Sequence, residues 1–353
     1  MFKYPIWIIL AAILIFGFTQ TKKPTAYLFP KLQAFPPMPV NPTNLVTIEG
    51  VELGRYLFYD PILSSDSSIA CATCHQQAFA FSDGHKRFSE GINNTKLKRN
   101  TPALFNLAWN EALFWDGKAE NIEHQVFFPV TDHQEMDLNW QMAERRLNKS
   151  TFYRNLFLNA FGVAEIDSVL VSKAIAQFER TILSYNTRLD RALRREVFLT
   201  KEELKGLELL NDQSKGNCLH CHPTDANFVG STGKFSNNGL DVANSPSDYK
   251  DKGRGGVTGI PNDMGLFKIP SLRNIAVTAP YMHDGRFNTL EEVLDFYTEG
   301  VNKSINIDSK MHFSHATGVS LSAEEKKQII IFLNALTDSV LISSKAFANP
   351  FDN

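Results

Sequence analysis

Apolar residues recur at intervals of three and four along most of this chain, whereas the alternation typical of β-strands is scarce. The pattern predicts a helix from about Thr47 to Tyr59 and a long helix from roughly Asp167 to Val197. The stretch from Gly230 to Gly265 is rich in Gly, Asn, Asp and Ser, which predicts a loop. We therefore expect a mainly α fold.

Two more helices are predicted from capping boxes at their N-termini. Thr200 and Glu203 have the spacing of such a box, and Ser322 and Glu325 repeat it before a helix that runs through Leu336. The apolar face of the helix after Thr200 consists of Leu204, Leu207 and Leu210.

The four cysteines fall in two identical C-x-x-C-H frames, Cys71 and Cys74 before His75, and Cys218 and Cys221 before His222. This frame is the attachment signature of c-type haem, in which two thiols form thioethers and the histidine binds the iron. A thioredoxin-like redox pair, a disulfide and half of a zinc site are the alternatives. Two haems c use all four cysteines and both histidines, so we favour them.

Each frame follows a predicted helix, which indicates two cytochrome c-like domains, each carrying one covalently bound haem c. A chain of 353 residues is long enough for two domains. Its 36 basic and 38 acidic residues nearly balance, so nothing in the charge calls for nucleic acid.

The first twenty residues form a separate segment. Lys3 precedes an apolar run from Pro5 to Phe18, which is shorter than the ~20 residues that span a bilayer comfortably. We interpret it as a signal peptide, with an uncleaved N-terminal anchor as the alternative because the cleavage site is poor. Both interpretations predict a periplasmic protein, either soluble or held by that anchor.

Longer motifs around each haem frame carry a family resemblance. They are ELGRYLFYDPILSSDSSIACATCH at 52–75, RNTPALFN at 99–106, FWDGKAENIEHQVFFPVTDHQEM at 114–136, GNCLHCHP at 216–223 and IPSLRNIAVTAPYMHDGRFNTLEE at 269–292. In this order they resemble the bacterial diheme cytochrome c peroxidase family, including its MauG (methylamine-utilisation) subgroup. The resemblance covers nearly the whole chain after the leader.

The resemblance implies a division of the chain into five parts. We expect a signal peptide or anchor at 1–20, an extended leader at 21–45 and an N-terminal peroxidatic haem domain at 46–185. A C-terminal electron-transfer haem domain at 186–338 and a tail at 339–353 follow.

The resemblance also implies roles for individual residues. His75 is then the proximal ligand of the peroxide-reacting haem, and Trp115 matches the tryptophan that lies between the two haems. Gln125, Pro129 and Glu135 match the distal pocket, where a carboxyl group of raised pKa can move a proton as the O–O bond breaks.

One calcium ion between the domains is a further implication of the resemblance. Asn100, Thr278 and Pro280 match its ligands, and amide and carbonyl oxygens suit this hard ion.

Two positions depart from typical members of the family. Where those members carry a second, distal histidine on the N-terminal haem, this chain has Ile92, so we expect an iron open to peroxide without reductive activation. His85 is the rival ligand. The second position is Tyr297, which we expect on the side of the C-terminal haem opposite His222. Typical members have methionine there, and MauG-like members have tyrosine. Met311 is the rival ligand, and aromatic packing is an alternative role for Tyr297.

Three functions follow as hypotheses. The first is a cytochrome-c peroxidase that reduces hydrogen peroxide with electrons from a small cytochrome c or cupredoxin. The second is a MauG-like oxidase that uses peroxide-derived high-valent haem to oxidise side chains of a partner protein, and the third is a non-catalytic diheme electron carrier. The oligomeric state stays open, with a homodimer as one alternative.

Overall fold

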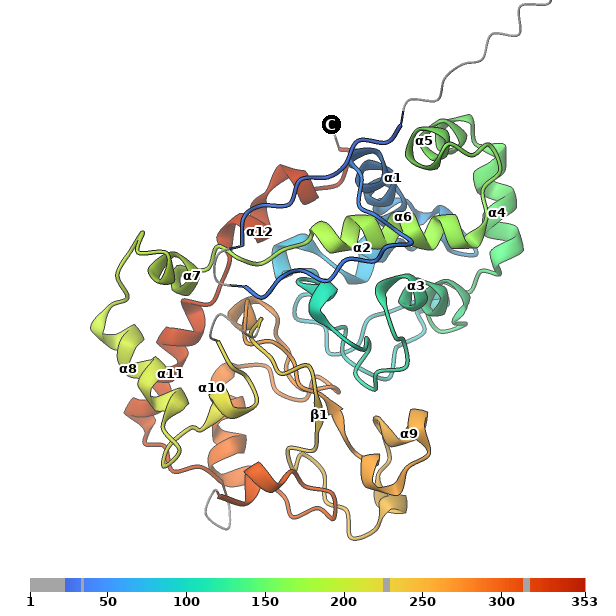
Figure 1. Cartoon of the computed structure of the whole chain (residues 1–353). Helices are drawn as coiled ribbons and strands as arrows, with labels where there is room; N and C mark the ends of the chain where they lie inside the picture. The colour runs from blue at the N-terminus through green and yellow to red at the C-terminus, as the bar shows by residue number, and fades with distance from the viewer. Residues whose placement is uncertain (1–22, 33–34, 225–228, 314–317, 353) are drawn as a thin grey trace, which may run out of the picture.

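The structure is a computed structural model that describes residues 23–32, 35–224, 229–313 and 318–352 (Figure 1). Helices make up its two halves. Those of the N-terminal half are α1 (Ile48–Tyr59), α2 (Cys71–Cys74), α3 (Ile122–Thr131), α4 (Trp140–Lys149), α5 (Thr151–Phe161) and α6 (Ser168–Thr181). Those of the C-terminal half are α7 (Arg188–Leu193), α8 (Lys201–Asn211), α9 (Gly255–Thr258), α10 (Leu290–Asp295) and α11 (Ala323–Asn334).

Regular sheet in the described residues is limited to one short pair of strands. Strand β1 (Phe235–Ser236) pairs antiparallel with β2 (Phe267–Lys268). The mainly α prediction is therefore confirmed. The stretch from Gly230 to Gly265, expected to be loop, is mostly irregular but also contains β1 and the one-turn helix α9.

Each half is built around its own close crossing of two helices. In the N-terminal half α1 crosses α6, and a Cβ on Gly54 would lie 2.0 Å from the carbonyl oxygen of Ala174. In the C-terminal half α8 crosses α11, and a Cβ on Gly206 would lie 2.2 Å from the carbonyl oxygen of Gln328. Glycine is required at both crossings because any side chain would force the helices apart. The predicted repeat of one plan thus extends to the packing.

The predicted helix starts are confirmed. Thr47 caps α1 by accepting from the Gly50 amide. The capping boxes at Thr200 and Ser322 are both present, at the N-termini of α8 and α11.

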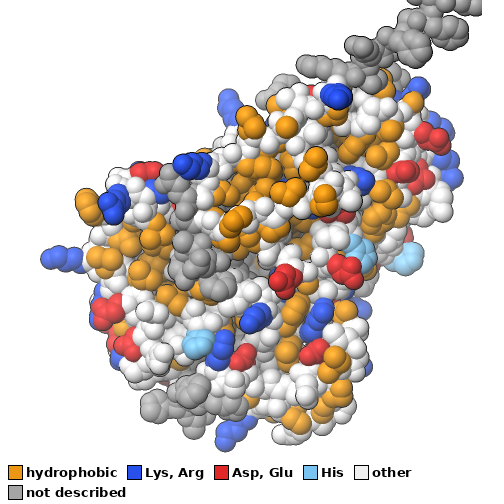
Figure 2. Space-filling model, viewed as in Figure 1, with side chains coloured by type: hydrophobic (Ala, Val, Ile, Leu, Met, Phe, Trp, Pro, Cys, Tyr) orange, Lys and Arg blue, Asp and Glu red, His pale blue; other side chains and the backbone are white. Residues whose placement is uncertain are grey.

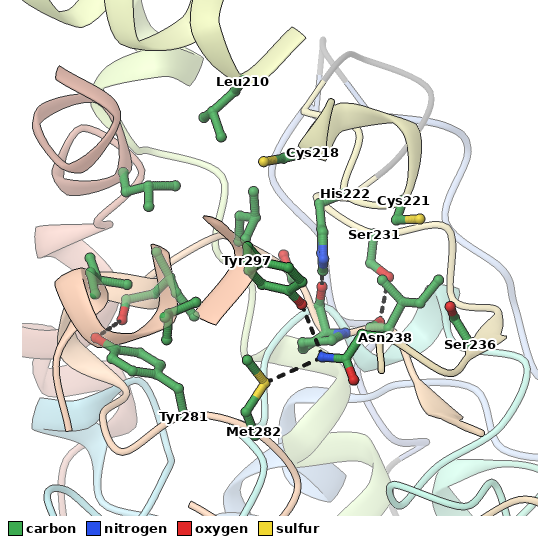
Figure 3. A pocket seen from close by; sticks show the side chains of 18 of the residues that line it. Leu210, Cys218, Cys221, His222, Ser231, Ser236, Asn238, Tyr281, Met282 and Tyr297 are labelled. Atoms are coloured by element: carbon green, nitrogen blue, oxygen red, sulfur yellow. Dashed lines mark hydrogen bonds between the residues drawn. The ribbon is translucent and has the colours of Figure 1, made fainter. Parts of the chain in front are cut away.

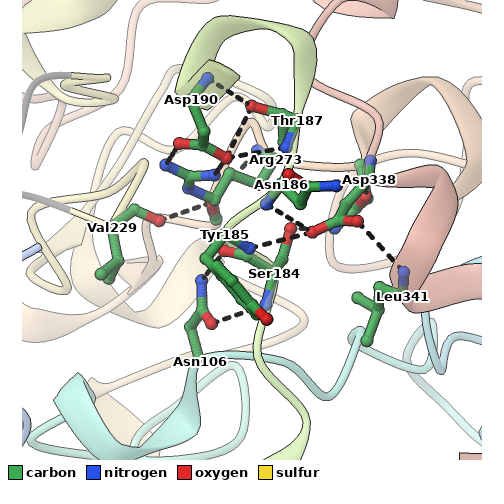
Figure 4. A network of polar contacts seen from close by, with 12 residues as sticks. Asn106, Ser184, Tyr185, Asn186, Thr187, Asp190, Val229, Arg273, Asp338 and Leu341 are labelled. Carbon is green, nitrogen blue, oxygen red and sulfur yellow. Dashed lines mark hydrogen bonds and ion pairs between the residues drawn. The ribbon is translucent and has the colours of Figure 1, made fainter. Parts of the chain in front are cut away.

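The long helix predicted from Asp167 to Val197 is wrong. Helix α6 ends at Thr181, residues 182–187 are not helical, and α7 is short. Side chains from elsewhere satisfy the backbone of this connection (Figure 4). Asn106 accepts from the Ser184 amide at 2.9 Å, and Asp338 accepts from the Tyr185 and Asn186 amides at 2.9 and 2.8 Å. These tertiary hydrogen bonds replace those that a continuous helix would make.

The described residues of the leader, 23–32 and 35–45, are extended along the N-terminal half, and Phe35 also contacts the guanidinium of Arg273 in the C-terminal half (Figure 1). Tyr27 donates its amide to the Val46 carbonyl, which pairs the leader with the segment before α1. Large apolar side chains remain exposed here, among them Leu28 and Leu45, and Figure 2 shows apolar atoms spread across this face. The leader is therefore part of the folded surface.

Residues 339–352 also return to the N-terminal half. Helix α12 (Ser339–Ser343) contacts the turn after the first haem frame, where the Gln77 side chain donates to the Leu341 carbonyl at 2.9 Å. Leu341 is buried in the same apolar cluster as Phe58 and Phe81, and Cys71 packs against that cluster. This segment therefore completes the core behind the first haem frame.

We expect Leu341→Ala to lower the free energy of unfolding by about 2–5 kcal/mol, because Leu341 is 1% exposed and its truncation leaves a cavity. The neighbouring Val340 is 51% exposed, so Val340→Ala is a matched control with an expected loss of about 0.5 kcal/mol or less. Denaturant unfolding of both variants measures the difference. Equal losses would show that α12 does not contribute to the core.

No helix among the described residues is long and apolar enough to cross a membrane. The predicted signal peptide or anchor at 1–20 lies outside those residues.

Candidate functional site

Each haem frame opens onto its own cavity. The N-terminal cavity, of about 580 Å³, is lined by Cys71, Cys74 and His75. The C-terminal cavity, of about 420 Å³, is lined by Cys218, Cys221 and His222 (Figure 3). The two cysteine pairs therefore do not meet, as a zinc site assembled from both frames would require.

Both histidines are oriented for metal binding through one ring nitrogen. Nδ1 of His75 donates to the Phe81 carbonyl at 2.7 Å, and Nδ1 of His222 donates to the Pro270 carbonyl at 2.8 Å. Because a carbonyl can only accept, Nδ1 carries the proton and Nε2 keeps its lone pair. Burial lowers the pKa of His75 to about 4 and also lowers that of His222. Both imidazoles are thus neutral at pH 7, the form that binds iron.

The cysteines fit covalent haem attachment better than the alternatives. All four are free thiols, and burial raises the pKa of Cys74 to about 11 and that of Cys218 to about 12. These raised pKa values argue against thiolate ligation of a metal, because the thiolate is the form that binds metal. Among the described residues, no group of three or more His, Cys, Asp or Glu side chains could hold a metal ion.

The expected distal residues lie together in the N-terminal cavity. Gln125 and Pro129 are on α3, Glu135 follows its C-terminus, and Trp115 precedes it; all four side chains line the cavity with His75. Asn121 caps α3 by accepting from the His124 amide, which fixes where the helix begins.

Glu135 is a buried carboxyl group whose pKa lies near neutral pH. Burial, with a smaller contribution from the charge of Asp132, raises its pKa to about 7. The ammonium of Lys118 acts in the opposite direction. Its Nζ lies 4.2 Å from the ring centroid of Phe114 and 4.7 Å from that of Phe128. Glu135 can therefore take up and release a proton near neutral pH.

Trp115 lies in the wall that separates the two cavities. Its side chain lines both of them, and its indole N–H donates to the Asn100 carbonyl at 2.7 Å. The carbonyl of Trp115 accepts from the Lys268 amide at 2.8 Å. The indole is thus fixed between the two haem frames.

The three residues expected to bind calcium, Asn100, Thr278 and Pro280, all line the C-terminal cavity. The Asn100 side-chain amide donates to the carbonyls of Lys86 and Arg87 at 3.2 and 3.3 Å.

The C-terminal cavity contains both expected candidates for the sixth ligand and one that the sequence did not suggest. Tyr297, on the π-helix η9 (Phe296–Gly300), and Met311 both line it. So does Met282, which shares a hydrogen-bond donor with Tyr297 (Figure 3). Nδ2 of Asn238 lies 3.1 Å from the Tyr297 hydroxyl and 3.6 Å from the Met282 sulfur. Burial raises the pKa of Tyr297 to about 12, so its phenol is protonated without iron.

At the position of the missing distal histidine, Ile92 is buried and its amide donates to the Glu135 carbonyl at 2.9 Å. The rival ligand His85 is exposed and packs against the Phe79 ring. It is not among the residues that line the N-terminal cavity.

Sequence reasoning missed a second buried acid, Glu179, in the N-terminal cavity. It is 3% exposed, and its Oε2 has no hydrogen-bond partner among the described residues. Burial raises its pKa to about 8. Helical spacing places it four residues after Ile175, which lines the same cavity, so the periodicity of α6 could have indicated it.

Comparisons with known proteins identify the family of this chain. Residues 48–197 match the family model described as di-haem cytochrome c peroxidase. The methylamine utilization protein MauG of Methylorubrum extorquens is 34% identical over 83% of this chain and 79% of its own length. The cytochrome c551 peroxidase of Nitrosomonas europaea is 32% identical over 85% of this chain and 84% of its own length.

A solved structure gives the same result. The crystal structure of a MauG-like protein associated with microbial copper homeostasis superposes with a TM-score of 0.81 at 34% identity, covering 92% of this chain and 98% of that one. The diheme peroxidase BthA of Burkholderia thailandensis, at 19% identity and a TM-score of 0.72, shares the fold. This chain belongs to the di-haem cytochrome c peroxidase family, which implies two haems c and peroxidase activity.

Proposed function

We propose that this protein reduces hydrogen peroxide at the N-terminal cavity with electrons from a small redox protein, a cytochrome c or a cupredoxin. One peroxide, two protons and two electrons give two molecules of water. The observation that carries the proposal is Glu135, a carboxyl group with a pKa of about 7 in the same cavity as His75.

The residues that line this cavity have different roles in the proposed reaction. Cys71, Cys74 and His75 would hold the haem, whose iron supplies the redox chemistry at the O–O bond. Glu135 accepts a proton from one peroxide oxygen and returns it to the other as that oxygen leaves as water. Gln125 and Pro129, on the wall formed by α3, shape the space in which peroxide binds.

Electrons reach this cavity from the C-terminal half. The indole of Trp115, fixed in the shared wall, is the group through which we infer that they pass. Asn100, Thr278 and Pro280 would bind calcium beside it, and a periplasmic location suits the protein. The chain would then consist of a signal peptide or anchor (1–20), an extended leader (21–45), the peroxidatic haem domain (46–185), the electron-transfer haem domain (186–338) and a tail (339–353).

A second candidate function is oxidation of a partner protein, as in MauG. Tyr297 favours it, because a tyrosine among the residues that line the C-terminal cavity is the feature that the MauG-like branch implies. A fast reaction with peroxide followed by slow turnover with ferrocytochrome c would support this function over the first.

The experiment that tests the proposal is electron paramagnetic resonance of the oxidised diheme protein, before and after peroxide is added. With Ile92 in place of a distal histidine, we expect a high-spin ferric signal beside a low-spin one, both lost quickly with peroxide. Two low-spin signals that do not respond would contradict an always-open site. If one-electron reduction then failed to restore reactivity, the electron-carrier hypothesis would replace the peroxidase.

The rate of the reaction with peroxide should rise with pH and level off above about pH 7. Glu135 must be deprotonated to accept a proton, and its pKa is about 7, so the rate falls below that pH. Stopped-flow absorption across pH 5 to 9 measures the profile. Asp132→Asn should move the midpoint to lower pH and Lys118→Met to higher pH, because Asp132 raises and Lys118 lowers this pKa. Shifts in the same direction would argue against Glu135 as the titrating group.

A further inference from the structure

Within the described part of the chain, the wall between the two haem cavities contains one ionisable side chain. Among the described residues, six line both cavities, and only Lys268 carries a titratable group. The six are Asn100, Thr101, Pro102, Ala103, Trp115 and Lys268. A charge on Lys268 is therefore next to both haem sites.

The backbone of Lys268 is held on two sides. It belongs to β2, where it pairs with Phe235 of β1. Its amide donates to the carbonyl of Trp115 at 2.8 Å, which ties it to the other fixed member of the wall. The fold thus fixes the position of the Lys268 backbone, to which the side chain is attached.

Lys268 has no acidic partner among the residues that the structure describes. Neither an ion pair nor a side-chain hydrogen bond of Lys268 is found within the described part of the chain, whereas the nearby Arg99 pairs with both Asp116 and Asp251 at 2.6 and 2.7 Å. Burial lowers the pKa of Lys268 to about 8, so most molecules still carry the ammonium at pH 7. A charge this poorly compensated acts on its surroundings over a longer range than a paired one.

Four other lysines line the N-terminal cavity; Lys118 differs from Lys268 only in lining that cavity alone, since both are half-buried, and the other three differ in exposure as well. Lys98, Lys250 and Lys252 line that cavity alone, and all three are exposed. Solvent screens exposed charges, so these lysines act weakly and on one haem site only.

We propose that the ammonium of Lys268 is a shared electrostatic element that raises the reduction potentials of both haems together. Reduction adds one negative charge to each haem site, and a nearby unpaired cation stabilises the reduced form of either. The inference rests on the family's two haems and does not depend on the peroxide reaction proposed above. Lys268 thus acts through the electrostatic effect of its charge and takes no part in bond cleavage.

The test is a potentiometric titration of the holoprotein, followed by the absorption of each haem, without peroxide. In Lys268→Met we expect the reduction equilibrium of each haem to fall about tenfold, equivalent to about 59 mV for a one-electron couple. Lys268→Arg keeps the charge and should retain both potentials within a fraction of that shift. Lys252→Met is the matched control: it also removes one lysine charge, but from one cavity and from an exposed position, so both potentials should stay nearly unchanged.

Two results would overturn the proposal. One is a Lys268→Met protein with both haems attached and both potentials unchanged, and the other is a shift confined to a single haem. Covalent haem content and the thermal midpoint confirm that the variants are folded. Since the readout is equilibrium potential, loss of peroxidase activity in any variant leaves this test intact.

Discussion

Replacing Glu135 with Gln should slow the reaction of the oxidised protein with hydrogen peroxide by about 10²–10⁴-fold, the usual contribution of a general acid–base group. Glutamine keeps the size of the side chain but cannot accept the proton. Glu135 does not belong to either haem frame, so both haems should remain attached with unchanged absorption. Stopped-flow mixing with peroxide measures the rate.

The matched control is Glu179→Gln, which removes the other buried acid of the same cavity. Glu179 is on α6, whereas Gln125 and Pro129 are on α3, the helix that directly precedes Glu135. We therefore expect Glu179→Gln to leave the rate within a few-fold of the wild type. If instead Glu179→Gln lost the reaction and Glu135→Gln kept it, the acid–base role would belong to Glu179.

The second large effect concerns stability. Asp190 and Arg273 form a two-point ion pair with both contacts at 2.7 Å, their side chains 0% and 6% exposed (Figure 4). Asp190→Asn leaves a buried guanidinium without its counter-charge and should lower the free energy of unfolding by about 3–5 kcal/mol. Denaturant unfolding of the holoprotein measures this loss.

Exposure decides the size of this effect, and an exposed pair provides the comparison. Lys326 and Asp295 are also 2.7 Å apart, but Asp295 is 66% exposed, so Asp295→Asn should cost about 0–1 kcal/mol. Arg273 lowers the pKa of Asp190 in the folded state. The stabilisation is thus present above the unfolded pKa of about 3.9 and is lost as pH falls through the lower folded value. Equal losses in Asp190→Asn and Asp295→Asn would argue against a buried-charge penalty.

The haem frames could be predicted from the sequence because their chemistry is local. Two cysteines and a histidine within five residues determine the attachment, and the following turn supplies the carbonyl that orients His75. Capping boxes are local as well, which is why the starts of α8 and α11 were predicted correctly.

Features that depend on distant partners could not be predicted in the same way. The apolar pattern from Asp167 to Val197 continues past Thr181, but Asn106 and Asp338 bind the backbone there and end the helix. Asn238, from another part of the chain, contacts both Met282 and Tyr297, and no local sequence pattern indicates that these three residues meet. The position of Lys268 between two cavities likewise follows from how the halves pack.

The return of residues 339–352 to the N-terminal half has a consequence for maturation. An exported chain crosses the membrane from its N-terminus, so Cys71 and Cys74 emerge before Leu341, which belongs to the cluster against which Cys71 packs. Until then the first attachment site belongs to an unfinished domain, and its thiols stay open to the enzymes that add haem. We expect haem insertion at this site to precede completion of the fold, so that the closing segment seals a cofactor already in place.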